Sequence, residues 1–279
     1  DVPLVFHQEG LDERIVEKLN MWTKEPNLSR WEKIAHTVRN PTGHISIAMV
    51  GKYVELVDSY KSINESLAHG GFANECRVDV AHIDSEQLTN DIFPDTLQQA
   101  DGILVPMGFG QRGAEGKIAA VRYARENGIP FLGICFGMQM AVIEFARHVC
   151  GLENANSTEV DEKTPDPIIA LMDEQRAIVA KGGTMRLGAY PCVLSDNSLA
   201  LSLYKHKQIS ERHRHRYEFN NAYRELLTSK GMILSGLSPD GTLVEAVELR
   251  DHPWFIGLFN STSILPSSTQ PMDRWPMGQ

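Results

Sequence analysis

The run of residues from Gly128 to Gln139 constrains the fold more than any other part of the chain. It reads Gly-Ile-Pro-Phe-Leu-Gly-Ile-Cys-Phe-Gly-Met-Gln. Residues 129–134 are a short apolar run, which suits an interior strand of a parallel sheet. After Cys135, apolar side chains recur every three or four residues as far as Val149, as on one face of an amphipathic helix. We therefore predict a buried strand that turns directly into a helix at Cys135.

Cys135 has one glycine two residues before it and another two residues after it. This is the spacing of a nucleophile elbow, a turn so tight that side chains at both flanking positions would collide. We expect an exposed sulfur, and a thiol pKa lowered by the N–H groups and dipole of the following helix. The alternative is a buried structural cysteine, which is the commoner environment of a free cysteine. The paired glycines favour the nucleophile.

Strands and helices alternate in the first half of the chain, which predicts an α/β fold with a mainly parallel sheet flanked by helices. The expected strands are 45–50, 76–83, 102–106 and 129–134, and the expected helices include 11–22, 28–38, 60–68 and 116–126. The helix over 60–68 is expected to end at Gly70-Gly71. The later part predicts an antiparallel extension, because short strands follow one another with a turn at Pro239-Asp240-Gly241. These later strands are 184–194, 208–220, 232–237 and 242–249, and residues 254–258 are expected to return to a buried strand.

Composition and charge exclude several classes of function. The net charge of −9 leaves no basic footprint for a nucleic acid or an anionic membrane. No apolar run approaches the roughly 20 residues that span a bilayer. The four cysteines (Cys76, Cys135, Cys150 and Cys192) have neither metal-ligand nor disulfide spacing. We therefore expect reduced thiols in a cytoplasmic protein, with no metal site.

Two runs carry a resemblance to a known family. Residues 132–139 read Leu-Gly-Ile-Cys-Phe-Gly-Met-Gln, and residues 153–159 read Glu-Asn-Ala-Asn-Ser-Thr-Glu. The chain resembles the glutaminase domains of CTP synthases, which are class I (triad) glutamine amidotransferases with a flavodoxin-like fold. Further similar runs are 51–53, 182–188 and 212–217. The resemblance implies a linker from a synthetase half over 1–44, a glutaminase domain over 45–262, and a loop or disordered tail over 263–279.

The resemblance also implies the roles of individual residues. Cys135 is the nucleophile, and the backbone N–H groups of Met107 and Phe136 form the oxyanion hole. The residues implied to bind glutamine are Gly108, Phe136, Gln139, Glu159 and Arg216. Among them, Arg216 binds the carboxylate and Glu159 the ammonium group.

One of these assignments has a plainer alternative, and at another position the sequence differs from the family. Without the resemblance, the arginines of 212–217 would be read as one exposed face of an edge strand, with the two histidines on the other face. At Met107 the family has glycine, and a positive φ there would cost methionine more than glycine.

The proton acceptor expected beside the cysteine is missing. A cysteine nucleophile of this class needs a histidine, and a carboxylate that orients the histidine. The family has both in Gln-Phe-His-Pro-Glu-Phe, but here Leu258 is followed directly by Phe259, and five residues of that pattern are absent. Either the natural protein lacks them, or they were removed, or they belong to the protein but not to the sequence as printed. The intact flanks favour the last two explanations. None of the ten histidines is an obvious substitute, so we expect glutamine analogues to bind but turnover to be poor.

The function implied by the resemblance is hydrolysis of L-glutamine through a cysteine thioester. The ammonia would serve the ATP-dependent amination of UTP to CTP by a synthetase domain absent from this chain. No cofactor is expected in this domain, whereas ATP, Mg and GTP are implied for the whole enzyme, as is a homo-oligomer. The alternatives are a catalytically silent module that binds glutamine or a nucleotide, and another cysteine hydrolase of the same fold, such as a γ-glutamyl hydrolase.

Overall fold

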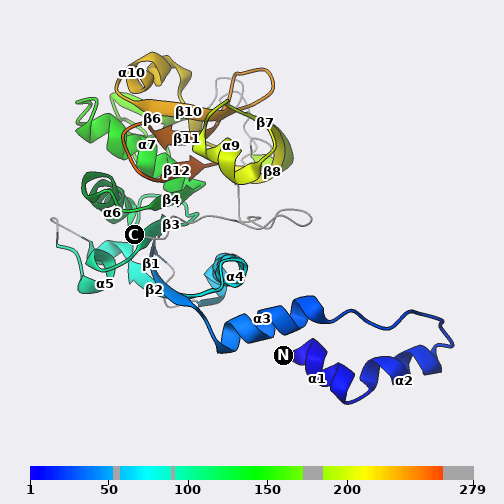
Figure 1. Cartoon of the computed structure of the whole chain (residues 1–279). Coiled ribbons are helices and arrows are strands. Elements are labelled where there is room, and N and C mark those ends of the chain that lie inside the picture. Colours follow the sequence, from blue (N-terminus) through cyan, green and yellow to red (C-terminus); the bar gives the residue numbers. More distant parts are fainter. Residues whose placement is uncertain (53–56, 89–91, 172–184, 260–279) are drawn as a thin grey trace.

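A single nine-stranded sheet forms the centre of the molecule (Figure 1). The computed structural model describes residues 1–52, 57–88, 92–171 and 185–259. Five neighbouring strands are parallel: β2 (Cys76–Asp84), β1 (Gly43–Gly51), β3 (Gly102–Val105), β4 (Phe131–Ile134) and β12 (Phe255–Leu258). Four antiparallel strands extend the sheet: β11 (Val244–Leu249), β10 (Met232–Leu237), β7 (Arg186–Leu194) and β8 (Gln208–His215). The predicted α/β class, parallel half and antiparallel extension are confirmed.

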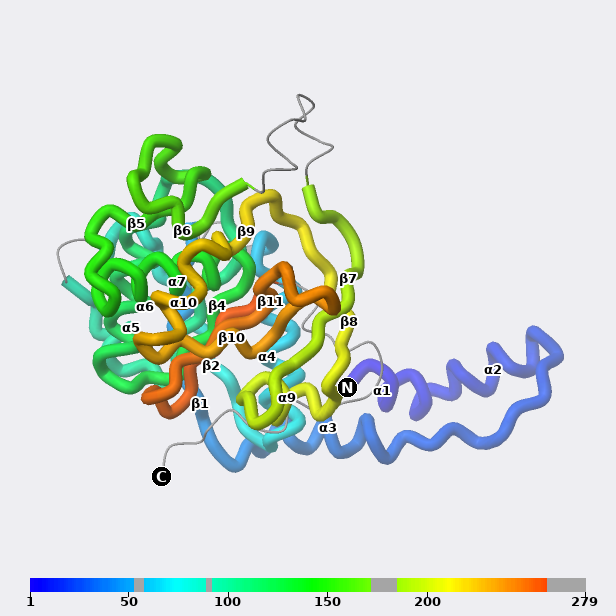
Figure 2. The backbone as a smooth tube through the Cα atoms, turned by 90° about the horizontal axis from the view of Figure 1, so that it is seen from above, coloured from blue at the N-terminus to red at the C-terminus, as the bar shows by residue number. Residues whose placement is uncertain are grey.

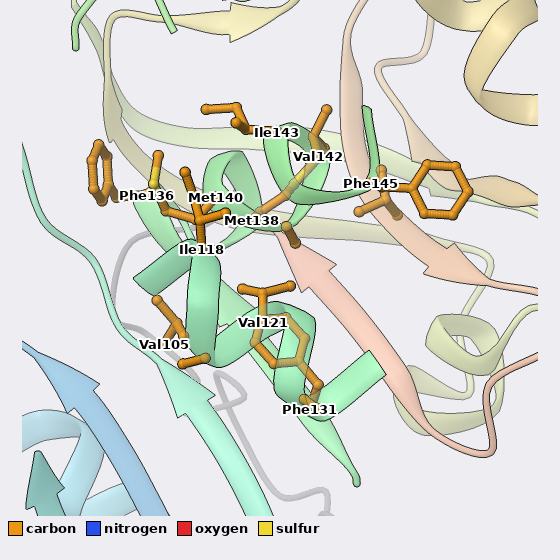
Figure 3. Packing of buried hydrophobic residues seen from close by; sticks show 14 of the residues in the cluster. Val105, Ile118, Val121, Phe131, Phe136, Met138, Met140, Val142, Ile143 and Phe145 are labelled. Carbon is orange, nitrogen blue, oxygen red and sulfur yellow. The ribbon is translucent and has the colours of Figure 1, made fainter. Parts of the chain in front are cut away.

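Helices cover both faces of this sheet because its strands are apolar on both sides. In β1, Ile47 and Met49 belong to one buried cluster, and Ala48 and Val50 belong to the other. The first cluster includes residues of α4 (Lys61–Ala73) and α9 (Leu199–Tyr204). The second includes residues of α6 (Ala114–Asn127), α7 (Phe136–His148) and α10 (Arg224–Ser229). Figure 3 shows the packing of α6 and α7 side chains in this second cluster.

A small three-stranded sheet stands beside the main one and was not predicted. Its strands are β5 (Ala155–Ser157), β6 (Asp166–Ala170) and β9 (Glu218–Phe219). The prediction of one strand over 208–220 is therefore wrong, since β8 ends at His215 and β9 pairs with β6 instead. Arg216 lies in the link between the two sheets and not on a strand face. The plainer interpretation holds for Arg212 and Arg214, which are exposed on the edge strand β8 while the two histidines are buried.

The first 40 residues form a helical arm that projects from the body (Figures 1 and 2). Its helices are α1 (Val2–Gln8), which was not predicted, α2 (Leu11–Lys18) and α3 (Ser29–Arg39). Neither α1 nor α2 has a buried residue, and an ion pair of 2.9 Å joins Asp1 to Arg39. The arm therefore has no core of its own, and its boundary at residue 44 stays a prediction.

Short elements complete the described chain: α5 (Asp95–Gln98) and the 3-10 turns η1 (Val57–Tyr60), η2 (Ser85–Gln87) and η3 (Asn221–Tyr223). Among the described helices, none combines the length and the hydropathy of a membrane span. Residues 182–184 and the predicted tail 263–279 lie outside the described residues.

The helix that follows β1 does not stop where its glycines predict. We expected an end at Gly70-Gly71, but α4 continues to Ala73. A Cβ at Gly71 would lie 2.7 Å from the carbonyl oxygen of Cys76, whereas a Cβ at Gly70 would meet nothing within 4 Å. Gly71 is therefore there to let α4 approach β2 closely, not to end the helix.

This difference predicts opposite effects of the same substitution at two adjacent positions. Gly70→Ala should raise the free energy of unfolding by about 0.5–1 kcal/mol, because alanine is the better helix former. Gly71→Ala should lower it by about 1–3 kcal/mol, because the added methyl group pushes α4 off the sheet. Urea unfolding followed by circular dichroism measures both. Stabilisation by both substitutions would show that the close contact at Gly71 does not constrain the fold.

Candidate active site

Cys135 occupies a strained turn between β4 and α7. Its backbone has φ 54° and ψ −104°, a conformation that non-glycine residues rarely adopt. A Cβ at Gly133 would lie 2.8 Å from the backbone of Gly137, and one at Gly137 would overlap the carbonyl oxygen of Val105. The Cys135 N–H donates to the carbonyl of Leu258 at 2.7 Å. The predicted elbow and its steric cause are confirmed.

The state of the thiol differs from the prediction. The side chain of Cys135 is only 2% exposed, and burial raises the pKa of its thiol to about 12. The N–H of Phe136 at the start of α7 opposes this rise of the pKa, Glu159 and Glu218 add to it, and Lys117 opposes it. The expectations of an exposed sulfur and a lowered pKa are wrong, because desolvation outweighs the helix terminus.

The predicted oxyanion donors lie in two turns, one at the nucleophile and one after β3. Phe136 follows Cys135 directly, and its N–H is close enough to lower the thiol pKa. Met107 lies in the turn after β3, and it is not among the described residues with a positive φ. Its side chain packs against the buried cluster that contains Tyr60 and Cys135. Methionine is thus accommodated without the backbone strain considered for this position, and the donor role stays a prediction.

Glu159 lies near the thiol of Cys135, and Arg216 lies close enough to Glu159 to act on its charge. A carboxylate oxygen of Glu159 accepts a hydrogen bond of 2.8 Å from the N–H of Gly110. Burial raises the pKa of Glu159, while Lys52 and Arg216 lower it. Glu159 follows β5, and Arg216 lies between β8 and β9, so the unpredicted small sheet brings them together. A free amino acid carries an ammonium and a carboxylate on one carbon, so such a pair suits it.

Gln139 and Gly108 lie at the same end of the sheet. Gln139 is one turn into α7 and 2% exposed, and its Oε1 has no hydrogen-bond partner within the described ranges. Gly108 is buried against the base of α6, since a Cβ there would lie 2.8 Å from Nζ of Lys117. Both residues are within the site, and their contacts with glutamine stay predictions.

Lys117 is a residue of the site that the sequence reasoning missed. Its side chain is 0% exposed and its Nζ has no hydrogen-bond partner among the described residues. Burial lowers its pKa to about 8, with further lowering by Lys52 and Arg112. The signal was present, because position 117 falls on the apolar stripe of α6 together with Ala114, Ile118 and Val121.

A buried network of charged and aromatic side chains lies behind the site. Arg186 bonds Glu245 at 2.8 Å and Glu218 at 3.4 Å. Burial raises the pKa of Glu218 to about 8. The ring of His215 stacks on Phe259 with 4.6 Å between ring centres, and burial lowers the pKa of His215 to about 3. A histidine of this pKa is too weak a base for a thiol of pKa about 12, so it does not replace the missing one.

The junction after β12 contains no histidine as far as the structure describes it. The chain passes directly from Leu258 to Phe259, whose N–H donates to the carbonyl of Glu245 at 2.9 Å. Within the described ranges, no group of three or more His, Cys, Asp or Glu side chains could hold a metal ion. The described site therefore consists of a thiol, a pair of opposite charges and a buried ammonium.

Comparison with known families agrees with this geometry. Residues 55–258 match the model of the family "Glutamine amidotransferase class-I". The chain belongs to this family. Its membership accounts for the elbow at Cys135 and for the parallel sheet that carries it.

Two curated relatives place the chain more finely within the family. The CTP synthases of Syntrophus aciditrophicus (strain SB) and Geobacter metallireducens (strain ATCC 53774 / DSM 7210 / GS-15) are 57% and 56% identical to it over 257 residues. The alignments cover 92% of this chain and 48% of each relative. The chain thus spans about half the length of these relatives.

A solved structure of a single domain also matches most of this chain. The glutaminase domain of Trypanosoma brucei CTPS, with bound acivicin, is 37% identical with a TM-score of 0.72, covering 82% of this chain and 89% of that one. The predicted resemblance to the glutaminase domains of CTP synthases is confirmed.

The buried ammonium predicts an unusual pH dependence of stability. The pKa of Lys117 falls from 10.5 in the unfolded chain to about 8 in the folded one. Below pH 8 the folded protein bears the full penalty of this charge, on the order of 3 kcal/mol. Between the two pKa values the unfolded chain holds more protons than the folded one, so the penalty is lost as the pH rises.

Lys117→Met should therefore raise the free energy of unfolding near pH 7, and the gain should shrink as the pH approaches 10.5. Urea unfolding at several pH values measures the difference from the parent protein. The exposed Lys163→Met is the matched control and should change little at any pH. A Lys117→Met protein less stable than its parent near pH 7 would contradict the penalty.

Proposed function

We propose that this chain hydrolyses L-glutamine with Cys135 as the nucleophile. The observation that carries the proposal is the strained elbow, which holds Cys135 at the start of α7 and near Glu159, a carboxyl group that has Arg216 close to it. The sulfur bonds to the side-chain amide carbon, and the C–N bond breaks once the nitrogen has taken a proton. Ammonia leaves and a glutamyl thioester remains. Water then breaks the C–S bond, which releases glutamate and restores the thiol.

The charges around the thiol suggest how glutamine lies in the site. Arg216 takes the α-carboxylate and Glu159 the α-ammonium, which directs the side-chain amide toward the elbow. The unpartnered, buried Oε1 of Gln139 can accept a hydrogen bond from the ligand. The N–H groups of Met107 and Phe136 then face the oxygen on which negative charge develops.

For the whole enzyme we propose the activity of its relatives. The curated relatives named CTP synthase are about twice as long as this chain, so a synthetase half would use the ammonia to convert UTP to CTP. ATP, Mg and GTP would act with that half, in a cytoplasmic homo-oligomer. The arm over 1–44 supports a second half, because Phe6, Ile15, Leu19 and Trp22 are exposed apolar side chains on it. We propose that the synthetase half covers them.

The missing base limits the rate that this chain can reach. With a thiol pKa of about 12, roughly one molecule in 10⁵ carries a thiolate near pH 7. This observation favours a second candidate, a module that binds glutamine without turning it over. The two candidates differ in their response to an added histidine, because only a hydrolase would gain rate from it.

Ammonia release from glutamine separates them. Insertion of Gln-Phe-His-Pro-Glu between Leu258 and Phe259 should raise the rate at least about 100-fold, which is the usual contribution of a general base. Cys135→Ser should abolish the release in both backgrounds. A lengthened protein that binds glutamine but releases no ammonia would identify a binding module. The intact mass of the natural protein, compared with 31.2 kDa, tells whether the five residues are present there.

Binding of glutamine tests the pair of charges separately from turnover. Arg216→Met and Glu159→Gln should each weaken glutamine binding by about 10- to 100-fold, because each removes a hydrogen bond to a charged group. Isothermal titration calorimetry of the chain without the inserted residues measures this with little interference from hydrolysis. Arg214→Met, a loss of the same charge two residues earlier on the exposed face of β8, should leave the affinity unchanged. Equal losses at Arg214 and Arg216 would mean that only the overall charge matters.

A further inference from the structure

The ammonium of Lys117 is buried beside the turn at the nucleophile and the turn after β3. Lys117 lies near the start of α6, and its Nζ is 4.9 Å from the centre of the Phe136 ring. The turn after β3 is equally close, since a Cβ at Gly108 would lie 2.8 Å from Nζ and 3.4 Å from the Phe136 ring. The charge therefore faces the site and not the solvent.

A purely structural role does not account for this position. Long charged side chains on a buried helix face usually extend until the charge reaches water, but Lys117 is 0% exposed. Buried charges are usually paired, yet no carboxylate, carbonyl or hydroxyl oxygen of the described residues accepts a hydrogen bond from Nζ. A buried ammonium without an acceptor needs a negative group beside it. The working protein has to supply that group.

We propose that the ammonium of Lys117 stabilises the thiolate of Cys135 and so does part of the work for which the family uses its histidine. The inference rests on the proposed role of Cys135 as nucleophile. Lys117 acts through Cys135 and neither forms nor breaks a covalent bond. Because Lys117 already holds its own proton, the thiol proton leaves to water.

The other charges around Lys117 and Cys135 favour an interaction between the ammonium and the thiolate. The carboxylate of Glu159 after β5 opposes a negative charge on Cys135, and Glu218 on β9 opposes it as well once the pH exceeds the Glu218 pKa of about 8. His215 beside Glu218 is neutral, since its pKa is lowered to about 3. Lys117 itself is faced by Lys52 and Arg112, which disfavour its charge. The thiolate is the negative group that relieves this repulsion.

The titration of Lys117 supplies a signature that a structural residue would not have. The side chain carries its charge below its pKa of about 8 and loses the charge above it. Any support that it gives the thiolate must disappear over the same range of pH. The rate of reaction of Cys135 with a thiol reagent, which depends on the thiolate fraction, can be measured throughout this range.

The test is the rate of alkylation of Cys135 by iodoacetamide in the parent protein and in Lys117→Met, from about pH 6 to pH 10. Trypsin releases residues 126–147 as one peptide whose only cysteine is Cys135, so mass spectrometry separates its reaction from that of Cys150. Below pH 8 the parent should react about tenfold faster, which corresponds to one unit of thiol pKa. The ratio should fall toward one as the pH passes about 8.

Two further readouts keep the result decisive. Lys163→Met, which removes an exposed lysine, should match the parent at every pH. The parent and Glu218→Gln should both show a break in the slope of the rate near pH 8, so the inference is tested even if Lys117→Met folds poorly. Glu218→Gln is included because the pKa of Glu218 is also raised to about 8, and a break that disappears in this variant belongs to Glu218 and not to Lys117. Equal rates in parent and Lys117→Met with no break would overturn the role of Lys117 and leave Cys135 as the nucleophile. A Cys135 that stays unreactive in the parent would overturn both.

Discussion

The close backbone contact between α7 and β3 is the constraint on which the site depends. Gly137 lies so near the carbonyl of Val105 that any side chain would overlap it. This contact holds the first turn of α7 against the end of β3, where the turn with Met107 and Gly108 begins. The hydrogen bond from Cys135 to Leu258 fixes the other side of the elbow. The sulfur is therefore positioned by the ends of three neighbouring strands, β3, β4 and β12.

That position sets two physical effects on the thiol against each other. A helix terminus contributes at most about 2 kcal/mol to a neighbouring charge. The rise of the Cys135 pKa from 9.0 to about 12 corresponds to on the order of 4 kcal/mol in favour of the neutral thiol. Desolvation wins, so the elbow orients the sulfur without ionising it. Activation has to come from a base or from a cation close by, and this explains why the charges around the site matter more than the turn itself.

The parts that sequence predicted are those whose cause is local. The apolar runs of β1 and β4 and the glycines around Cys135 act within a few residues of themselves. The end of α4 was predicted wrongly because Gly71 is required by a contact with another element, the carbonyl of Cys76 on β2. Strands β5 and β9, at three and two residues, are too short to show a pattern, and β6 begins with Asp166 and Pro167, which are residues typical of turns. The burial of Cys135 depends on side chains from the whole domain, which no local pattern contains.

Several buried polar atoms around the thiol reduce the stability of the fold and can be satisfied by a ligand. The Nζ of Lys117, Oε1 of Gln139 and Oε2 of Glu218 are buried and form no hydrogen bond with any residue that the structure describes. Each such atom typically costs about 1–3 kcal/mol. A substrate amide offers both donors and an acceptor, so binding can recover part of this free energy. These residues lie on α6, α7 and β9, whereas the histidine of the family would come after β12. Binding and proton transfer are thus carried by separate segments, and the binding site can persist where the base is lost.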